Sequence, residues 1–263
     1  MITKDNIVKV VGTIVLLIMF GTACKKNEDT LPADPGNTVP TGKLEKLDEF
    51  HMNIAEPSGL SFGRTKQSLF TVSDNSNKVY EMDLQGNVIR ELAYTGEDLE
   101  GITCNPDDNV LAVVEERKRE VVFLNYETGA ELNRYKINVK EGDSNKGLEG
   151  ISWNTNNRAY YLLNENNPAL MMVWKPDAGI ISEVDMNFAY DYSGIYADSE
   201  NSFLWIVSDE SQMLYRCNYN AKVLEKYELN FSKAEGIAVD YENNRIYVIS
   251  DKLSKLFVYK MVN

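Results

Sequence analysis

The stretch Asp98-Leu-Glu-Gly-Ile102 decides the fold, because similar stretches recur at regular intervals along the chain. Each copy ends in a glycine followed by an aliphatic residue. The five copies are Glu56-Pro-Ser-Gly-Leu60, Asp98-Leu-Glu-Gly-Ile102, Gly147-Leu-Glu-Gly-Ile151, Asp191-Tyr-Ser-Gly-Ile195 and Lys233-Ala-Glu-Gly-Ile237. Successive glycines are 42, 49, 44 and 42 residues apart. A period of this length indicates a repeat architecture in which each copy opens one supersecondary unit.

The residues after each copy read as short strands separated by turns. The second strand of every repeat is rich in β-branched and aromatic residues and ends in a carboxylate. These second strands are Leu69–Asp74, Leu111–Glu116, Tyr160–Glu165, Leu204–Asp209 and Ile246–Asp251. Four strands in about 40–45 residues are typical of a propeller blade. The sequence therefore predicts an all-β, five-bladed β-propeller over residues 43–263, with six blades as the less favoured count.

The last repeat is too short to complete its own blade. From Gly236 to the end the chain has 28 residues, which is enough for three strands. The segment from Lys43 to Ile54 precedes the first repeat, alternates apolar and polar residues, and has no blade of its own. We expect this N-terminal strand to pair with the last blade and close the ring, because closure removes an open sheet edge.

Two rings of polar side chains should meet on one face of the propeller. Consecutive strands of a blade are antiparallel, so the start of the first strand and the end of the second lie on the same face. The inner ring is Ser58, Glu100, Glu149, Ser193 and Glu235, and the outer ring is Asp74, Glu116, Glu165, Asp209 and Asp251. We expect this acidic face to bind the ligand. Tyr192, Trp153 and Tyr196 are expected near it. The alternative is a place in the core between blades, which is the favoured place for Trp153 and Trp205.

The three inner glutamates, Glu100, Glu149 and Glu235, are the candidate metal ligands. Carboxylates that converge on one channel repel one another, which raises their pKa values unless a cation or hydrogen-bond donors keep them ionised. Calcium suits such a site, because it accepts oxygen ligands in flexible numbers. The alternative is that each glutamate caps backbone N–H groups at the start of a blade. Likewise, the outer carboxylates could bond only the backbone of their own tight turns.

The first 42 residues predict an export signal and a tether. Lys4 and Lys9 precede the apolar run Val10–Phe20, which is too short for a final membrane anchor. The small residues just before Cys24 resemble the lipobox of bacterial lipoproteins, so residues 1–23 read as a lipoprotein signal peptide and Cys24 as the lipidated first residue of the mature chain. The alternative is an incidental thiol beside an ordinary cleavage site. Residues 24–42, rich in proline and polar residues, read as a flexible tether. The acidic residues just after Cys24 favour an outer-membrane lipoprotein, on the periplasmic side or at the cell surface, and an ordinary linker explains them equally well.

The composition excludes several classes of function. Against 27 Lys and Arg the chain has 40 Asp and Glu, for a net charge of −13, and no basic run suits a phosphate backbone. We therefore expect no nucleic-acid partner. With His51 as its one histidine and only three cysteines, the chain nearly excludes zinc enzymes and nucleophilic mechanisms that need a histidine base. Cys104 and Cys217 belong to blades that are not neighbours, so a disulfide between them is not expected.

Taken as a set, several runs resemble the SdiA-regulated family of bacterial envelope proteins. They are Pro57–Leu60 with Thr71–Asp74, Asp98–Ile102, Lys146–Ile151 with Asn164–Pro168, Ser193-Gly194 with Ser208–Ser211, and Ala234–Ile237. The resemblance covers roughly residues 47–262. It implies a β-propeller in the cell envelope, but it implies no established activity and carries over no catalytic residue.

Three classes of function follow from these observations. The leading interpretation is a binding module: a monomeric, lipid-anchored propeller that presents an acidic, calcium-binding face to a small molecule, a glycan or an envelope protein. The enzymatic alternative is a metal-assisted phosphoesterase or lactonase, or a glycosidase that uses Glu100 and Glu149 as acid and base at a defined separation. The third is an interaction platform that uses the rim or the opposite face.

Overall fold

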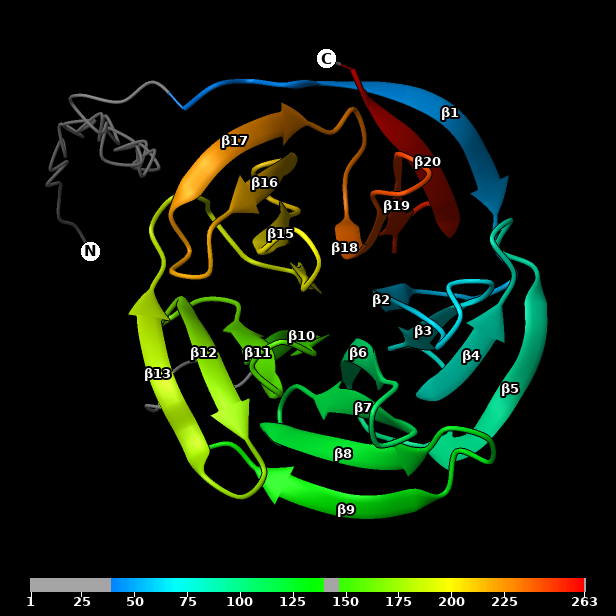
Figure 1. The fold of residues 1–263 in the computed structure, drawn as a ribbon. Coiled ribbons are helices and arrows are strands. Elements are labelled where there is room, and N and C mark those ends of the chain that lie inside the picture. Colours follow the sequence, from blue (N-terminus) through cyan, green and yellow to red (C-terminus); the bar gives the residue numbers. More distant parts are fainter. Residues whose placement is uncertain (1–38, 140–146, 263) are drawn as a thin grey trace, which may run out of the picture. The chain divides into compact units, whose positions relative to one another are not determined.

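The computed structural model describes residues 39–139 and 147–262, and within these ranges the chain forms strands joined by turns. Figure 1 shows the strands arranged as five sheets around a central axis, and each sheet has four antiparallel strands. The five-bladed count is therefore confirmed. The predicted signal peptide, Cys24 and residues 25–38 lie outside the described residues. Among the residues that are described, no helix is long and apolar enough to cross a membrane.

Each blade is built from strands in chain order, from the centre of the ring to its rim. Blade 1 contains β2 (Pro57–Phe62), β3 (Leu69–Ser73), β4 (Lys78–Met82) and β5 (Val88–Thr95). Blade 2 contains β6 (Leu99–Asn105), β7 (Val110–Glu115), β8 (Glu120–Asn125) and β9 (Glu131–Lys136). Blade 3 contains β10 (Leu148–Asn154), β11 (Ala159–Asn164), β12 (Leu170–Lys175) and β13 (Gly179–Asp185). Blade 4 contains β14 (Gly194–Asp198), β15 (Phe203–Ser208), β16 (Met213–Cys217) and β17 (Val223–Glu228).

Blade 5 is assembled from both ends of the propeller, as the sequence predicts. Its inner strands are β18 (Ala234–Asp240), β19 (Arg245–Ser250) and β20 (Lys255–Val262), and its outer strand is β1 (Lys43–His51). The pairing of β1 with β20 is antiparallel and runs from Lys43 opposite Val262 to His51 opposite Lys255. The strand ends at His51 rather than at Ile54. Met52 and Ile54 continue inward and are buried between blades 5 and 1.

The residues just before β1 are held by the neighbouring blade. Gly42 N–H donates to the Lys226 carbonyl at 2.9 Å, and Lys226 N–H donates to the Pro40 carbonyl at 3.0 Å. Thr41 pairs in parallel with Lys226 of β17. The N-terminal segment therefore joins the edge of blade 4 before it completes blade 5, and the last residues of the predicted tether belong to the fold.

The core lies between the blades. Five buried hydrophobic clusters each combine side chains of two neighbouring blades. The second strand of a blade contributes apolar residues to both of its faces, because it is covered on each side; every residue of β7 and β11 is buried. The free thiols of Cys104 and Cys217 are buried in this core.

Glycines at the axis let the first strands approach closely. A Cβ on Gly101 would lie 2.4 Å from the Glu149 carbonyl oxygen, so no larger residue fits there. The space at the axis that is lined by the glycines and the aliphatic residues after them amounts to about 10 Å³. This leaves room for about one water molecule, so the channel is constricted between its two mouths.

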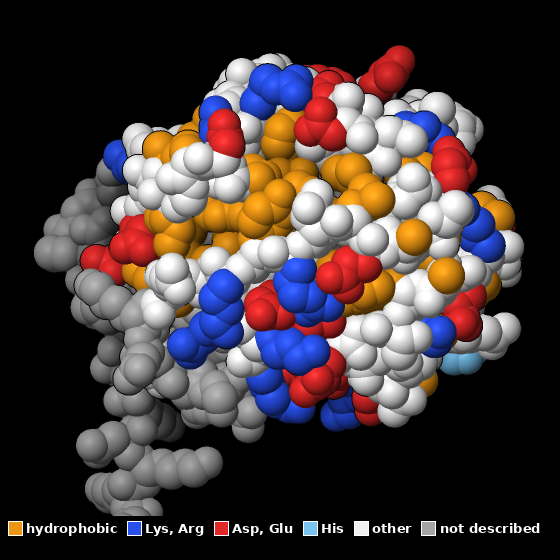
Figure 2. Space-filling view, turned by 90° about the horizontal axis from the view of Figure 1, so that it is seen from below, with side chains coloured by type: hydrophobic (Ala, Val, Ile, Leu, Met, Phe, Trp, Pro, Cys, Tyr) orange, Lys and Arg blue, Asp and Glu red, His pale blue; other side chains and the backbone are white. Residues whose placement is uncertain are grey.

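The rim is less polar than an acidic chain would suggest. Figure 2 views the rim from the side of β9 and β13 and shows apolar side chains at the surface between charged groups of both signs. These two outer strands carry the exposed side chains Leu132 and Ile181. An apolar patch of this kind is compatible with the interaction-platform alternative, which stays a prediction.

Candidate functional site

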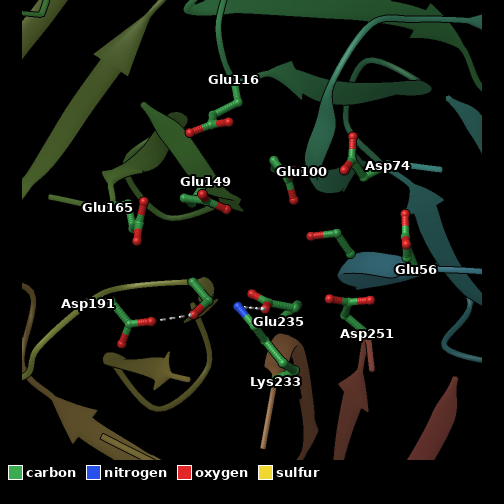
Figure 3. Close-up of a pocket in the computed structure, with 12 residues that line it drawn as sticks. Glu56, Asp74, Glu100, Glu116, Glu149, Glu165, Asp191, Lys233, Glu235 and Asp251 are labelled. Carbon is green, nitrogen blue, oxygen red and sulfur yellow. Dashed lines mark hydrogen bonds and ion pairs between the residues drawn. The ribbon is translucent and has the colours of Figure 1, made fainter. Parts of the chain in front are cut away.

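A cavity of about 270 Å³ opens at one mouth of the channel, and its wall is dominated by carboxylates (Figure 3). We call it the acidic mouth. Its wall consists of Glu56, Ser58, Asp74, Glu100, Glu116, Glu149, Glu165, Asp191, Ser193, Lys233, Glu235 and Asp251. Nine of these side chains are carboxylic and one is basic. The inner ring is therefore complete in the cavity wall, and Asp209 is the one predicted outer-ring residue that is not part of it.

A backbone hydrogen bond repeated around the ring brings the carboxylates together. The N–H of the outer-ring residue donates to the carbonyl of the first residue of its own repeat element. Glu116 donates to Asp98 at 2.9 Å, and Asp251 donates to Lys233 at 3.0 Å. Blades 1 and 3 make the same bond. Asp98 and Lys233 have positive φ values of 59° and 58°, so the chain turns sharply into the first strand there.

The serine before an outer carboxylate satisfies the turn, which leaves the carboxylate free to face the mouth. The Ser73 hydroxyl accepts the N–H of Ser76 at 3.0 Å, and the Ser208 hydroxyl accepts that of Ser211 at 3.1 Å. Where an outer carboxylate does accept a backbone N–H, the donor comes from the next blade. Gly147 N–H donates to Glu116 at 2.8 Å, and Lys233 N–H donates to Asp209. These bonds link neighbouring blades at the mouth.

Blade 4 departs from this pattern. Asp191, the first residue of its element, accepts the Ser208 hydroxyl and the N–H of Glu210 through its side chain. Its neighbour Ser193 donates N–H to the Val207 carbonyl at 3.0 Å. Asp191 is buried, and both of its carboxylate oxygens accept hydrogen bonds from these donors.

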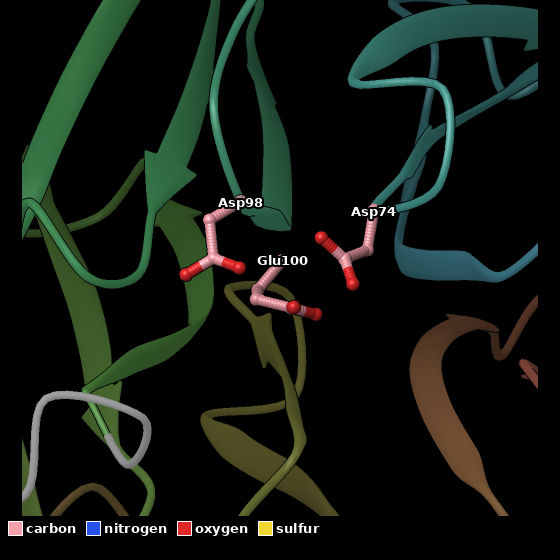
Figure 4. Close-up of side chains that lie close together, drawn as sticks. All are labelled: Asp74, Asp98 and Glu100. Atoms are coloured by element: carbon pink, nitrogen blue, oxygen red, sulfur yellow. The ribbon is translucent and has the colours of Figure 1, made fainter.

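Two clusters in the mouth have the spacing of a metal site. One combines Asp74, Asp98 and Glu100 (Figure 4), and the other combines Glu116, Glu149 and Glu165. In each cluster, one carboxylate oxygen per residue can be chosen so that all lie within 4.8 Å of one another. The structure thus groups Glu100 and Glu149 with outer carboxylates, in separate clusters. Acidic clusters that could bind a metal are present, and calcium itself stays a prediction.

Among the residues that the structure describes, Lys233 is the one basic side chain of the cavity wall. Its Nζ lies 2.9 Å from Asp209 Oδ2 and 3.7 Å from Glu235 Oε1. Burial opposes its charge, but the hydrogen bond to Asp209 and the nearby Glu235 raise the pKa of Lys233 overall. Lys233 therefore stays positive and compensates the carboxylates where blades 4 and 5 meet.

The remaining glutamates are costly to ionise together. Burial, with Asp98 and Glu165 nearby, raises the pKa of Glu116 to about 7. Burial, with Asp209 and Asp251 nearby, raises the pKa of Glu235 to about 8, although Lys233 opposes the shift. Burial and neighbouring carboxylates also raise the pKa values of Glu100 and Glu149 well above 4.5. Without a bound cation, the mouth therefore retains protons at neutral pH.

The capping alternative does not describe the three inner glutamates. In the part of the chain that the structure describes, none of them accepts a hydrogen bond from a backbone N–H. Ser58 is 3% exposed, and its hydroxyl has no hydrogen-bond partner. That hydroxyl faces the Glu100 carboxylate and partly offsets the rise in the pKa of Glu100. The mouth therefore contains a buried polar atom without a partner.

The aromatic residues expected near the acidic face do not line the acidic mouth. The alternative, a place in the core between blades, is confirmed for Trp153 and Tyr192. Trp153 and Tyr196 line a separate cavity of about 230 Å³ at the other mouth, together with Phe62. Strands β10 and β14 start at the acidic mouth and run away from it. Trp153 and Tyr196 come later in these strands and therefore lie toward the other mouth. Tyr192 is buried in the core, where its hydroxyl accepts the N–H of Phe188 at 2.9 Å.

The sequence analysis did not predict Glu56, Asp191 and Lys233 of the cavity wall, nor Asp98, which clusters with two wall residues. They are the first residues of the repeat elements, two positions before the inner ring. The signal was present, because four of the five elements begin with a charged residue. The strand pattern does not predict their location, because these residues precede the strands and are positioned by the turn that leads into the first strand.

The sequence model of the SdiA-regulated family matches residues 44–259, which span all five blades. The chain belongs to the SdiA-regulated family. Its repeat elements lie inside the matched region, so the acidic mouth of this SdiA-regulated protein is built by the family domain itself.

Solved structures with the same fold include enzymes. Glutaminyl cyclase of Myxococcus xanthus superposes on this SdiA-regulated propeller with a TM-score of 0.66, at 14% identity, over 85% of this chain and 100% of that chain. Virginiamycin B lyase of Staphylococcus aureus gives a TM-score of 0.51 at 18% identity, over 78% of this chain and 66% of that chain. A streptogramin B lyase gives a TM-score of 0.50 at 19% identity, over 84% of this chain and 73% of that chain. At these identities the likeness shows the propeller fold alone.

Proposed function

We propose that the protein is a lipid-anchored binding module of the outer membrane, whose acidic mouth holds a divalent cation, calcium, and presents it to a ligand of the cell envelope. The observation that carries the proposal is the charge of the mouth. Nine carboxylic side chains and one lysine line a cavity of about 270 Å³. A hard divalent cation offsets their repulsion with the oxygen ligands that calcium prefers.

Calcium should stabilise the folded protein. A ligand that binds only the folded state at about 100 times its Kd adds roughly 2.7 kcal/mol to the free energy of unfolding. For a domain of this size, each 1 kcal/mol raises Tm by about 2–4 °C, so we expect a rise of roughly 5–10 °C over a chelator. Thermal melts of the purified protein in calcium and in chelator measure this difference.

Two variants show whether the response comes from the mouth. Glu100→Gln removes one charged ligand while keeping the side-chain shape, so it should reduce the calcium response. Glu242→Lys changes an exposed residue in the β18–β19 turn, away from the mouth, and should leave the response unchanged. Wild-type melting curves that superimpose in calcium and chelator would contradict the cation site.

The lipid anchor is tested separately. Cys24 follows a small-residue segment that resembles a lipobox, and its lipidation would tether the propeller to a membrane. We expect Cys24→Ala to abolish incorporation of a labelled fatty acid and to release most of the protein from the membrane fraction, or to block its processing. Cys104→Ala is the matched control, because that thiol is buried in the core and cannot be acylated in the folded protein. Unchanged labelling of Cys24→Ala would show that the protein is not a lipoprotein.

A further inference from the structure

The boundary between blades 4 and 5 repeats the geometry of the boundary between blades 1 and 2, with one substitution. At each boundary, the outer carboxylate of one blade meets the first and inner residues of the next repeat element. Between blades 1 and 2 these are Asp74, Asp98 and Glu100. Between blades 4 and 5 they are Asp209, Lys233 and Glu235. Lys233 therefore takes the sequence position that Asp98 takes in blade 2.

The lysine gives its own boundary a built-in cation. Its Nζ lies 2.9 Å from Asp209 Oδ2 and 3.7 Å from Glu235 Oε1, so one ammonium serves both carboxylates (Figure 3 shows its contact with Glu235). In the cluster of Asp74, Asp98 and Glu100, the corresponding position is held by a third carboxylate, that of Asp98. Its positive neighbour is Arg117, which pairs with Asp98 at 3.1 Å, and the Arg117 side chain is 55% exposed. One peripheral guanidinium does not compensate three carboxylates.

A second observation points to the same place. Ser58 precedes Gly59, which packs against the Glu100 carbonyl, and the Ser58 hydroxyl lines the mouth without a hydrogen-bond partner. Leaving a buried hydroxyl without a partner costs free energy. A hydroxyl oxygen can also bind a hard cation, either directly or through a water molecule. The blade 1 to blade 2 boundary therefore offers both excess negative charge and an unused oxygen.

We propose that a calcium ion binds between blades 1 and 2 on Asp74, Asp98 and Glu100, at the position that corresponds to the Lys233 ammonium between blades 4 and 5. This inference rests on the proposed function and assigns its cation to particular residues. One oxygen from each of the three residues lies near enough to the others for a single ion to contact all three. Calcium accepts such oxygen ligands in flexible geometry at about 2.3–2.6 Å. Magnesium, with ligands at about 2.0–2.1 Å, requires a tighter octahedral set.

Each cluster already uses one carboxylate oxygen on a backbone N–H. Asp98 accepts that of Arg117 at 3.1 Å, and Glu116 accepts that of Gly147 at 2.8 Å. The two clusters differ in the residue at the first position of the repeat element. In the other cluster this position is occupied by Gly147, which supplies no side chain. Of the three glutamates expected from the sequence to bind the metal together, the proposed ion uses Glu100. Glu149 belongs to the other cluster, and Glu235 is paired with Lys233.

Exchanging the two first residues tests the assignment. Asp98→Lys should place an ammonium where the calcium ion binds, so calcium affinity measured by isothermal titration calorimetry should fall by roughly tenfold or more. In chelator, the Asp98→Lys variant should melt near or above the wild type. The lysine ammonium is part of the chain, so it offsets the carboxylates without a bound ion. Glu242→Lys, with the same change of charge on the exposed turn, should change calcium affinity by less than about twofold.

The reverse exchange should create a site. Lys233→Asp gives Asp209 and Glu235 a third carboxylate, so titration should show one more calcium ion per chain than in the wild type. This variant should be less stable than the wild type in chelator and should recover in calcium. The melt in calcium remains informative even if the Lys233→Asp variant is unfolded in chelator.

The outcomes separate this inference from the proposed function. If the wild type binds no calcium, the proposed function fails. If the wild type binds calcium, Asp98→Lys binds it equally well and Glu149→Gln does not, then the ion belongs to the other cluster and the inference is wrong while the proposed function stands. If Asp98→Lys loses calcium and Lys233→Asp gains it, the assignment is supported.

Discussion

Deletion of residues 43–54 should leave a chain that does not fold into a stable monomer. The deletion removes β1, whose backbone pairs with β20 over its whole length, and also Met52 and Ile54, which fill the core between blades 5 and 1. Burial of two such side chains contributes about 3–6 kcal/mol. Natural domains are stable by only about 5–15 kcal/mol, so the remaining margin is small or absent. The exposed edge of β20 should then pair with other chains.

Circular dichroism melts and size-exclusion chromatography measure this outcome. We expect loss of the cooperative transition and elution as aggregate. A synthetic peptide of residues 39–54 added during refolding should restore part of the monomer, because it supplies the missing strand. Lys46→Ala, which removes only an exposed ion pair of β1 with Glu49, is the control and should melt close to the wild type. A soluble deletion variant that melts near the wild type would show that the ring does not need β1.

Without a cation, the protein should lose stability as the pH rises from about 5.5 to 8.5. Burial raises the pKa of Glu116 to about 7 and that of Glu235 to about 8, and it raises those of Glu100 and Glu149 well above 4.5. In the unfolded chain these groups lose their protons near pH 4.3. Between these limits the folded state holds more protons than the unfolded state, so the free energy of unfolding falls as pH increases.

The free energy of unfolding should depend steeply on pH. Each proton retained only by the folded state lowers the free energy of unfolding by about 1.4 kcal/mol per pH unit, so two retained protons give roughly 3 kcal/mol per unit. Groups with lowered pKa values, such as Asp83 and Glu115, are ionised in both states over this range and do not oppose the trend. Melts in chelator at several pH values should therefore show Tm falling steeply toward alkaline pH.

Calcium and one substitution provide the controls for the pH experiment. Saturating calcium should flatten the slope, because the cation replaces the protons, and its affinity should rise with pH. Glu235→Gln should also flatten the slope in chelator, since the amide keeps the shape of a protonated carboxyl but cannot lose a proton. A Tm that rises between pH 5.5 and 8.5 in chelator would mean that the buried glutamates are ionised and compensated by other means.

The sequence predicted the architecture well because the repeat imposes it. Five glycine-containing elements and the short last repeat were enough to predict five blades and closure by the N-terminal strand. Because consecutive strands of a blade are antiparallel, the position of a residue along its strand determines which mouth it reaches, and this rule placed Glu100 and Glu149 in the mouth correctly. The same rule, applied as far as the ends of β10 and β14, would have placed Trp153 and Tyr196 at the opposite mouth.

Other parts of the site depend on geometry that the pattern does not contain. Asp98 and Lys233 reach the mouth because their backbones adopt positive φ values just before a strand begins. The grouping of Glu100 with Asp74 rather than with Glu149 depends on how far neighbouring blades are rotated about the axis. The ion pair of Lys233 with Asp209 links two blades, and no spacing within one repeat predicts it.

The constriction of the channel has a consequence for exchange rates. The axis leaves space of only about 10 Å³ beneath the acidic mouth, so an ion or solute bound there can arrive and depart only through the open side of that mouth. The surrounding carboxylates attract cations from solution, which makes capture fast and sensitive to ionic strength. Departure has to overcome the same attraction. The bound ion should therefore have a long residence time, and whatever ligand the propeller meets must approach the acidic side of the disc.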